Sequence, residues 1–123
     1  MKPAENYILE QPEPYKSILL HLQIFIESTF PDLKLEYKYK IPFYYLNDKP
    51  FCYLNSVVKK GYVDVGFWAS IHLKYNEFLV SDGRKVVKSL RYKTIEGINE
   101  EVLLSVLEEA YKVNNKGFWK KEE

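Results

Sequence analysis

The chain has 123 residues, and its 18 lysines and arginines against 17 aspartates and glutamates leave a formal net charge of +1. That length fits one domain with its own hydrophobic core, and the near-neutral charge excludes a general attraction to nucleic acid or to anionic lipid. No apolar run approaches the roughly 20 residues of a membrane span. The lone cysteine, Cys52, excludes an internal disulfide and, with no secretory signal after Met1, favours the cytoplasm.

The beginning of the chain divides into an arm and a helix. Residues 1–12 contain two prolines and little apolar periodicity, so we expect a loosely held arm there. From Glu13, apolar residues recur at helical spacing as far as Phe30 and predict an amphipathic helix. Pro14 suits its first turn, where the missing N–H would be unpaired anyway, and Pro31 prevents the helix from continuing.

The centre of the chain has the patterns of strands. Apolar residues alternate with lysine and glutamate over residues 33–41, which predicts a strand with one solvent-exposed face. Further strands are predicted at residues 43–46 and 51–58, joined by an Asn-Asp-Lys-Pro reversal, and at residues 62–68 after a turn at Gly61. Connections this short imply antiparallel pairing.

The last third of the chain predicts one more strand and one more helix. Residues 69–79 fit neither period and are interpreted as a short helical turn within a long connection. Alternation over residues 85–92 predicts the last strand. Asn99 can cap a final amphipathic helix with glutamates in its first turn, and Gly117 can stop it.

These elements predict an α+β fold of two layers. It has an N-terminal helix, an antiparallel sheet of about five strands and a C-terminal helix, with both helices on one face of the sheet. The expected organisation is an arm at residues 1–12, a single domain at residues 13–117 and a tail at residues 118–123.

Aromatic residues are abundant, with 11 tyrosines, 7 phenylalanines and 2 tryptophans. Those on predicted strands are Tyr37, Tyr39, Phe43, Tyr44, Tyr45, Phe51, Tyr53, Tyr62, Phe67 and Trp68. Adjacent strand residues point to opposite faces, so Tyr44 and Tyr45 cannot both face the helices, and some aromatic surface lies on the second face. Such a surface suits a ligand groove or self-association; alternatively, the rings only stabilise the sheet as cross-strand pairs.

Two further residues of the predicted 62–68 strand are unusual. Asp64 lies among apolar residues and needs either a ligand or a salt bridge, for which Lys38, Lys40 and Arg91 are the candidates. Gly66 removes a side chain, either where a ligand or another backbone comes close or where a bulge curves the sheet.

Catalytic and metal chemistry have weaker signals. An enzyme would need Cys52 close to a base such as His72, and no nucleophile elbow or oxyanion turn is present, so no catalytic residue and no cofactor are predicted. No ligand spacing links Cys52 with His21 or His72, so no metal site is predicted. The turn at residues 81–85 has a glycine beside two cations and suits a small anion, although a solvent-exposed turn is the commoner use of that pattern.

Several segments resemble the YdhG-like family, bacterial domains of unknown function. They are Pro14-Tyr15, Ile41-Pro42-Phe43-Tyr44, Lys49-Pro50 before Cys52-Tyr53-Leu54, the run from Gly61 to Trp68, and Lys88-Ser89-Leu90-Arg91. The resemblance spans roughly residues 12–111 and implies a helix, antiparallel sheet and helix, in a fold group with YjbR-like and frataxin-like proteins. A Bacillus member is a proposed frataxin-like iron chaperone for iron-sulfur cluster or haem assembly. Lysines balance the acids of the corresponding first helix and strand here, so no iron ligand is transferred.

The functional expectation is a non-enzymatic binding module that uses the aromatic sheet face. The expected ligand-binding residues are Tyr44, Tyr53, Asp64, Trp68 and Arg91. The expected partner is an unidentified small molecule or protein, with no nucleic acid and no membrane, and the same face also suits a homodimer. The alternative is the iron chaperone that the resemblance implies.

Overall fold

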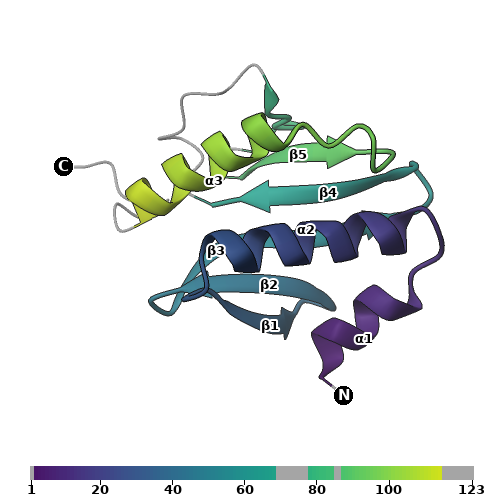
Figure 1. Ribbon diagram of the computed structural model, residues 1–123, viewed down its shortest axis with the longest axis horizontal. Coiled ribbons are helices and arrows are strands. Elements are labelled where there is room, and N and C mark those ends of the chain that lie inside the picture. The colour runs from purple at the N-terminus through teal and green to yellow at the C-terminus, as the bar shows by residue number, and fades with distance from the viewer. Residues whose placement is uncertain (1, 69–77, 85–86, 115–123) are drawn as a thin grey trace.

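The centre of the computed structural model, which describes residues 2–68, 78–84 and 87–114, is a five-stranded antiparallel sheet in chain order (Figure 1). Its strands are β1 (Lys34–Lys38), β2 (Ile41–Leu46), β3 (Lys49–Val57), β4 (Tyr62–Phe67) and β5 (Lys88–Tyr92). The helices are α1 (Pro3–Glu10), α2 (Tyr15–Thr29) and α3 (Glu100–Val113). The α+β prediction, with an antiparallel sheet between N-terminal and C-terminal helices, is confirmed.

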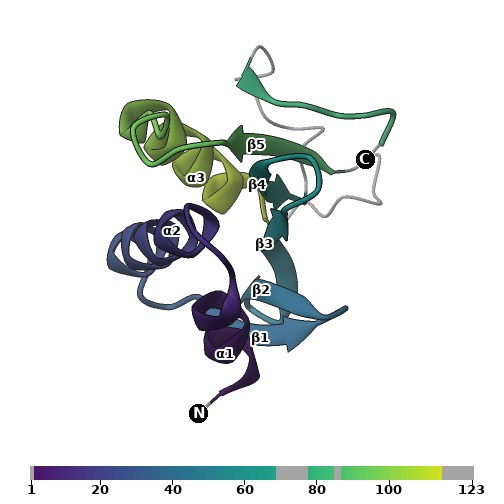
Figure 2. The ribbon, with the colours of Figure 1, turned by 90° about the vertical axis from the view of Figure 1, so that its right-hand side faces the viewer.

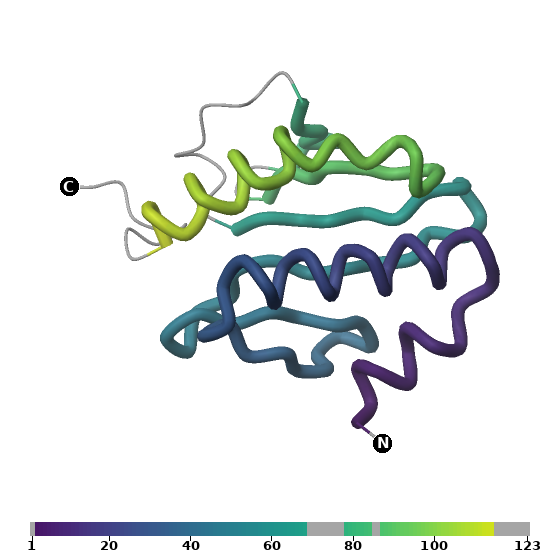
Figure 3. The backbone as a smooth tube through the Cα atoms, viewed as in Figure 1, coloured from purple at the N-terminus to yellow at the C-terminus, as the bar shows by residue number. Residues whose placement is uncertain are grey.

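All three helices lie on one face of the sheet, as Figure 2 shows. Helices α2 and α3 run side by side across it (Figure 3), and His21 Nε2 of α2 lies 2.7 Å from Glu100 Oε2 of α3. The buried core between the layers includes Ile18, Leu22 and Ile26 of α2, Val63, Val65 and Phe67 of β4, and Leu103, Val106 and Leu107 of α3. One sheet face is therefore a packed core, as the amphipathic helices predict.

The expected N-terminal arm is instead a helix. Pro3 occupies the start of α1, where its missing N–H is harmless, and Ala4 and Ile8, one turn apart, are both buried. The Tyr7 hydroxyl accepts a hydrogen bond of 2.9 Å from the Ser56 N–H of β3. The prediction of a loosely held segment at residues 1–12 is wrong for this helix. Its apolar stripe is short, but both of its residues, Ala4 and Ile8, are buried.

The first predicted strand, residues 33–41, is interrupted by a turn. Tyr39 and Lys40 have φ values of 53° and 67°, and Lys38 pairs with Ile41 on either side of them. Two consecutive left-handed residues form the type I′ loop that joins tightly twisted antiparallel strands. Alternation continues through this loop, which is why the pattern alone indicates one strand where the structure has the end of β1 and the start of β2.

The other predicted boundaries are close to those observed. Asn99 Oδ1 accepts a hydrogen bond of 3.2 Å from the Val102 N–H and caps α3 as expected. The helical turn expected within residues 69–79, the stop at Gly117 and the tail at residues 118–123 lie wholly or mostly outside the described residues. Over the part of the chain that is described, no helix is long and apolar enough to cross a bilayer.

Candidate functional site: the helix-free face of the sheet

Strand register gathers the unusual residues on the face that the helices leave open. One row across β2 to β5 contains Phe43, Tyr53, Gly66 and Ser89, and the neighbouring row across β3 to β5 contains Asn55, Asp64 and Arg91. Residues two apart on a strand share a face, so both rows lie on the same side of the sheet. This face is therefore the candidate functional site.

Asp64 is the centre of a polar network on this face. The residue is 4 % exposed, and its carboxylate accepts two hydrogen bonds, from Arg91 Nε to Oδ1 at 2.8 Å and from the Tyr53 hydroxyl to Oδ2 at 2.6 Å. Arg84 Nη1 lies 3.9 Å from the same Oδ2. Of the cations considered from the sequence, Arg91 is the one that pairs with Asp64. Both carboxylate oxygens are satisfied, as burial requires.

Arg84 fastens a loop segment, residues 78–84, to the sheet. Its guanidinium donates to the Tyr53 hydroxyl at 2.8 Å, to Ser89 Oγ at 2.9 Å and to the Val80 carbonyl at 3.0 Å. From the sheet side, Arg91 Nη2 donates to Asp82 Oδ2 at 2.5 Å. Two arginines and two aspartates thus balance one another, and the network has no excess charge to offer a ligand.

The protonation states agree with this arrangement. Burial raises the pKa of the Tyr53 hydroxyl, and its hydrogen bond to Asp64 raises that pKa further, so Tyr53 remains a donor to the carboxylate. The hydrogen bond from Arg91 lowers the pKa of the Asp82 carboxyl and keeps it ionised. Arg91 also lies over the ring of Tyr62, with Cζ 4.6 Å from the ring centroid, a cation–π geometry.

Gly66 leaves room for the ring of Tyr53. A Cβ at position 66 would lie 2.2 Å from Cε2 and Cζ of that ring, far inside van der Waals contact. The register of β4 with both neighbours is continuous through Gly66, so the residue marks no bulge. The close approach at this glycine is made by the Tyr53 side chain of the adjacent strand, not by the ligand or backbone that the sequence suggested, and it brings the Tyr53 hydroxyl to Asp64.

The remaining rings of this face form an aromatic cluster, which we define as Tyr39, Phe43, Tyr45, Tyr53 and Trp68. Phe43 lies at its centre and is 3 % exposed. The other ring centroids lie 5.3 Å (Trp68), 5.5 Å (Tyr39), 5.8 Å (Tyr53) and 6.2 Å (Tyr45) from that of Phe43. These separations are those of favourable aromatic pairs. Tyr39, at the hairpin tip, is 84 % exposed and presents its ring to solvent.

Tyr44 does not belong to this face, contrary to the expectation. It is fully buried on the helix side, where its hydroxyl donates to Glu27 Oε2 of α2 at 2.8 Å. Burial raises the pKa of this hydroxyl, so it stays protonated. Alternation correctly separates Tyr44 from Tyr45 but does not say which of them faces the helices. The structure brings together the other four expected residues, which are Tyr53, Asp64, Trp68 and Arg91. In place of Tyr44, its chain neighbours Phe43 and Tyr45 lie on this face.

Cys52 is a poor nucleophile in this structure. It is fully buried opposite Tyr44, and burial raises the pKa of its thiol, which keeps the unreactive protonated form. His72, its expected partner in an enzyme, lies outside the described residues. Within the described ranges, no three His, Cys, Asp or Glu side chains are placed to hold a metal ion.

Comparison with known proteins assigns the chain to a family but not to an activity. A family model described as a domain of unknown function, DUF5655, matches residues 4–114, and the chain belongs to that family. The fold is also that of a crystal structure of a DUF1801-family protein, YdhG from Bacillus subtilis, with a TM-score of 0.68 over 97 % of this chain and 98 % of that one. The two share 15 % sequence identity. The resemblance to YdhG-like proteins is confirmed. No curated protein matches the chain.

Proposed function

We propose that this domain is a non-enzymatic binding module that holds a flat, anionic small molecule against its aromatic cluster. This proposal rests mainly on the aromatic cluster around Phe43, in which Tyr53 stacks on Phe43, the other rings are tilted against it, and Tyr39 is exposed at the outer end. Tyrosine and tryptophan rings lose little conformational entropy on binding and stack readily on planar ligands. The polar network beside the cluster keeps Tyr53 in place, because Asp64 and Arg84 both bond its hydroxyl.

The charge of the ligand follows from the hairpin that carries Tyr39. Lys38 and Lys40 flank this tyrosine, and both are exposed. The arginines near the cluster are engaged by Asp64 and Asp82, and Lys38 Nζ lies 3.9 Å from Glu36 Oε1. Lys40 is therefore the main source of available positive charge at the tip. An anionic group on the ligand is therefore favoured over a cationic one.

The test uses anilinonaphthalene sulfonate, a flat anionic probe, in a fluorescence titration of the folded protein. The wild type should bind it saturably, and Tyr39→Ala or Tyr45→Ala should each weaken binding about threefold or more through loss of stacking. Lys40→Glu should also weaken binding, and added salt should reduce that difference. Ile24→Ala, which removes an exposed apolar side chain from α2, is the matched control and should change nothing.

Two results would contradict this function. One is the absence of saturable binding to a protein that unfolds cooperatively. The other is equal weakening by Tyr39→Ala and Ile24→Ala, since the probe would then bind apolar surface without selecting the aromatic cluster.

The iron-chaperone alternative gains no support from the described residues. Its acidic surface would need several carboxylates directed at one point, and no such group of three is found in the described ranges. Calorimetric titration with ferrous iron is its test, and saturable heat would favour it over the module proposed above.

A further inference from the structure

The strand β1 is an open edge of the sheet. It is the first strand in the order β1-β2-β3-β4-β5, and no described residue pairs with its outer side. Four of its five residues are exposed. At the opposite edge, by contrast, Val80 pairs with Ser89 of β5 through hydrogen bonds of 2.8 and 2.9 Å. Among the described residues, the 78–84 segment thus covers part of one edge, whereas the β1 edge is available for a further strand.

The backbone groups of Leu35 and Tyr37 point toward this open edge. Lys38 and Ile41 close the two-residue loop, and such a closing pair is hydrogen-bonded, so alternate residues of β1 bond outward. Pro42 lies opposite Tyr37 and has no N–H to donate, which agrees with Tyr37 and Pro42 being a pair without hydrogen bonds between β1 and β2. An added strand would therefore find donors and acceptors at Leu35 and Tyr37.

We propose that the partner at this edge is a second copy of the chain, paired antiparallel with β1 about a two-fold axis at Leu35. In this register Leu35 lies opposite Leu35 of the second copy. Lys34 then lies opposite Glu36, and Glu36 opposite Lys34, so every charge next to the axis meets its opposite. Opposite charges at facing positions stabilise an antiparallel pair, and like charges destabilise it. In this alignment residues 33–37 of one copy pair with residues 37–33 of the other, and the charges of the two strands are complementary.

Other registers are less favourable. A two-fold axis at Glu36 would place Glu36 opposite Glu36 and Lys34 opposite Lys38. An axis at Lys34 would place Lys34 opposite Lys34. An axis at Tyr37 pairs Glu36 with Lys38 but overlaps only residues 36–38 of the strand. The charges of Lys34, Glu36 and Lys38 thus disfavour pairing of this edge in most registers but favour the Leu35 register.

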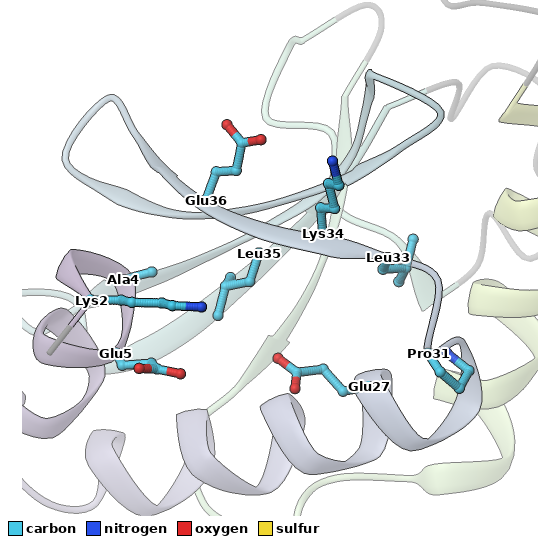
Figure 4. A pocket seen from close by; sticks show the side chains of 9 residues that line it. All are labelled: Lys2, Ala4, Glu5, Glu27, Pro31, Leu33, Lys34, Leu35 and Glu36. Atoms are coloured by element: carbon cyan, nitrogen blue, oxygen red, sulfur yellow. The ribbon is translucent and has the colours of Figure 1, made fainter.

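A cavity beside β1 fits this arrangement. It has a volume of about 600 Å³ and lies between α1, α2 and β1. Figure 4 shows Leu35 pointing toward the helices, with Glu5 and Glu27 directed into the same space, whereas Glu36 points to the other side of the strand. Leu33 also lines this cavity. The helix side of β1 is therefore hollow where a second strand would arrive.

In the Leu35 register, Tyr37 of the second copy lies opposite Leu33. Facing residues share a sheet face, so its ring arrives on the helix side, at the cavity. Tyr37 is 42 % exposed in the single chain, and burying its ring there would remove apolar surface from water. Glu5 and Glu27 offer carboxylate acceptors for its hydroxyl. By symmetry the contact forms twice, and the dimer closes because the same edge is used by both copies.

The experiment is sedimentation velocity of the full chain over a series of concentrations. The wild type should show a monomer–dimer equilibrium. Lys34→Glu and Glu36→Lys should each weaken dimerisation about tenfold, because attraction becomes repulsion at two symmetric contacts. The double variant Lys34→Glu/Glu36→Lys restores opposite charges and should recover the wild-type dissociation constant. The control is Lys60→Glu, which reverses the charge of an exposed residue in the β3–β4 turn and should have no effect.

The single variants also test the register. Lys34→Glu would strengthen a dimer whose axis lies at Glu36, since the acid introduced at position 34 would then face Lys38, so that result overturns the proposal. A wild type that stays monomeric at every concentration overturns it too, as does a double variant that folds normally but does not recover. Tyr37→Ala should weaken the dimer, and Tyr37→Phe should do so less. These outcomes are independent of the ligand proposed for the other face.

Discussion

Asp64 shows how a buried carboxylate is made tolerable on an apolar strand. Removing an ionised carboxylate from water costs several kcal/mol unless donors replace the lost hydration. Here a phenol and a guanidinium replace it, with a second guanidinium close by. Because these donors come from β3, β5 and the 78–84 segment, Asp64 joins three parts of the chain and keeps Tyr53 at a fixed place in the aromatic cluster.

Gly66→Ala should destabilise the protein by about 1–3 kcal/mol, the usual cost of overpacking a filled site. The added methyl would overlap the Tyr53 ring and displace its hydroxyl from Asp64. Chemical denaturation measures the loss. In the double variant Gly66→Ala/Tyr53→Ala, the glycine substitution should cost much less than it does alone. Additive costs would show that the ring is not what Gly66 accommodates.

Individual residues differ in how far their roles follow from the sequence. The need of Asp64 for a partner and the value of Gly66 as a close-approach site are local, and both were predictable. The choice of Arg91 among three cations depends on strand register. Arg84 was missed as a member of the network, because its sequence context is that of a surface turn, and only the fold brings that turn against β3, β4 and β5.

Among the helices and strands, α1 differs most from the sequence-based prediction, which expected an arm at residues 1–12. Its signals are Pro3 at the first helical position and the i, i+4 pair Ala4 and Ile8. Eight residues form too short a helix to be stable by themselves, so tertiary packing on the sheet decides the outcome. The two prolines that suggest an arm instead mark the start of α1 and the link to α2.

Ile8→Ala should lower the free energy of unfolding by about 2–5 kcal/mol, because Ile8 is fully buried in the common core. The neighbouring Leu9 is 46 % exposed, and Leu9→Ala should change stability by no more than about 0.5 kcal/mol. Urea denaturation of both variants makes the comparison. Similar small effects would restore the interpretation of this segment as a loosely held arm.

The sheet also departs from strict alternation at one point. Tyr44 pairs with Cys52 but Tyr45 pairs with Pro50, so Phe51 is an extra residue in β3. This bulge lets the adjacent Phe51 and Cys52 both face the helices, and both are buried. A period-2 pattern cannot represent such a shift, which is why the faces of β2 and β3 could not be assigned from the sequence.

For the whole molecule, the two sheet faces have different chemistry. One is an apolar core closed by three helices, and the other combines a balanced ionic network with an aromatic cluster. Tyr44 and Tyr92 are buried on the helix side and Tyr53 is half-buried on the other face, so their ionisation couples the stability of the entire fold to alkaline pH.

Stability should fall as pH rises above about 10, where tyrosines of the unfolded chain lose their protons. Burial raises the pKa of Tyr44, Tyr53 and Tyr92 in the folded chain, so above that pH the folded state keeps protons that the unfolded state has lost. Each further rise in pH therefore lowers the free energy of the unfolded state relative to the folded one. Tyr92→Phe should make this decline shallower by up to about 1.4 kcal/mol per pH unit. Tyr39→Phe, at an exposed site, is the control. Denaturation midpoints across alkaline pH give the slopes, and an unchanged slope for Tyr92→Phe would contradict the assignment.

The space that Gly66 leaves for Tyr53 also has an evolutionary consequence. A methyl group at position 66 is incompatible with the ring at position 53, and a small residue at position 53 would leave a void over the glycine. Neither position can change freely while the other is kept. Among relatives, the two should therefore be inherited as a pair, with a side chain at position 66 accompanied by a smaller or redirected residue at position 53.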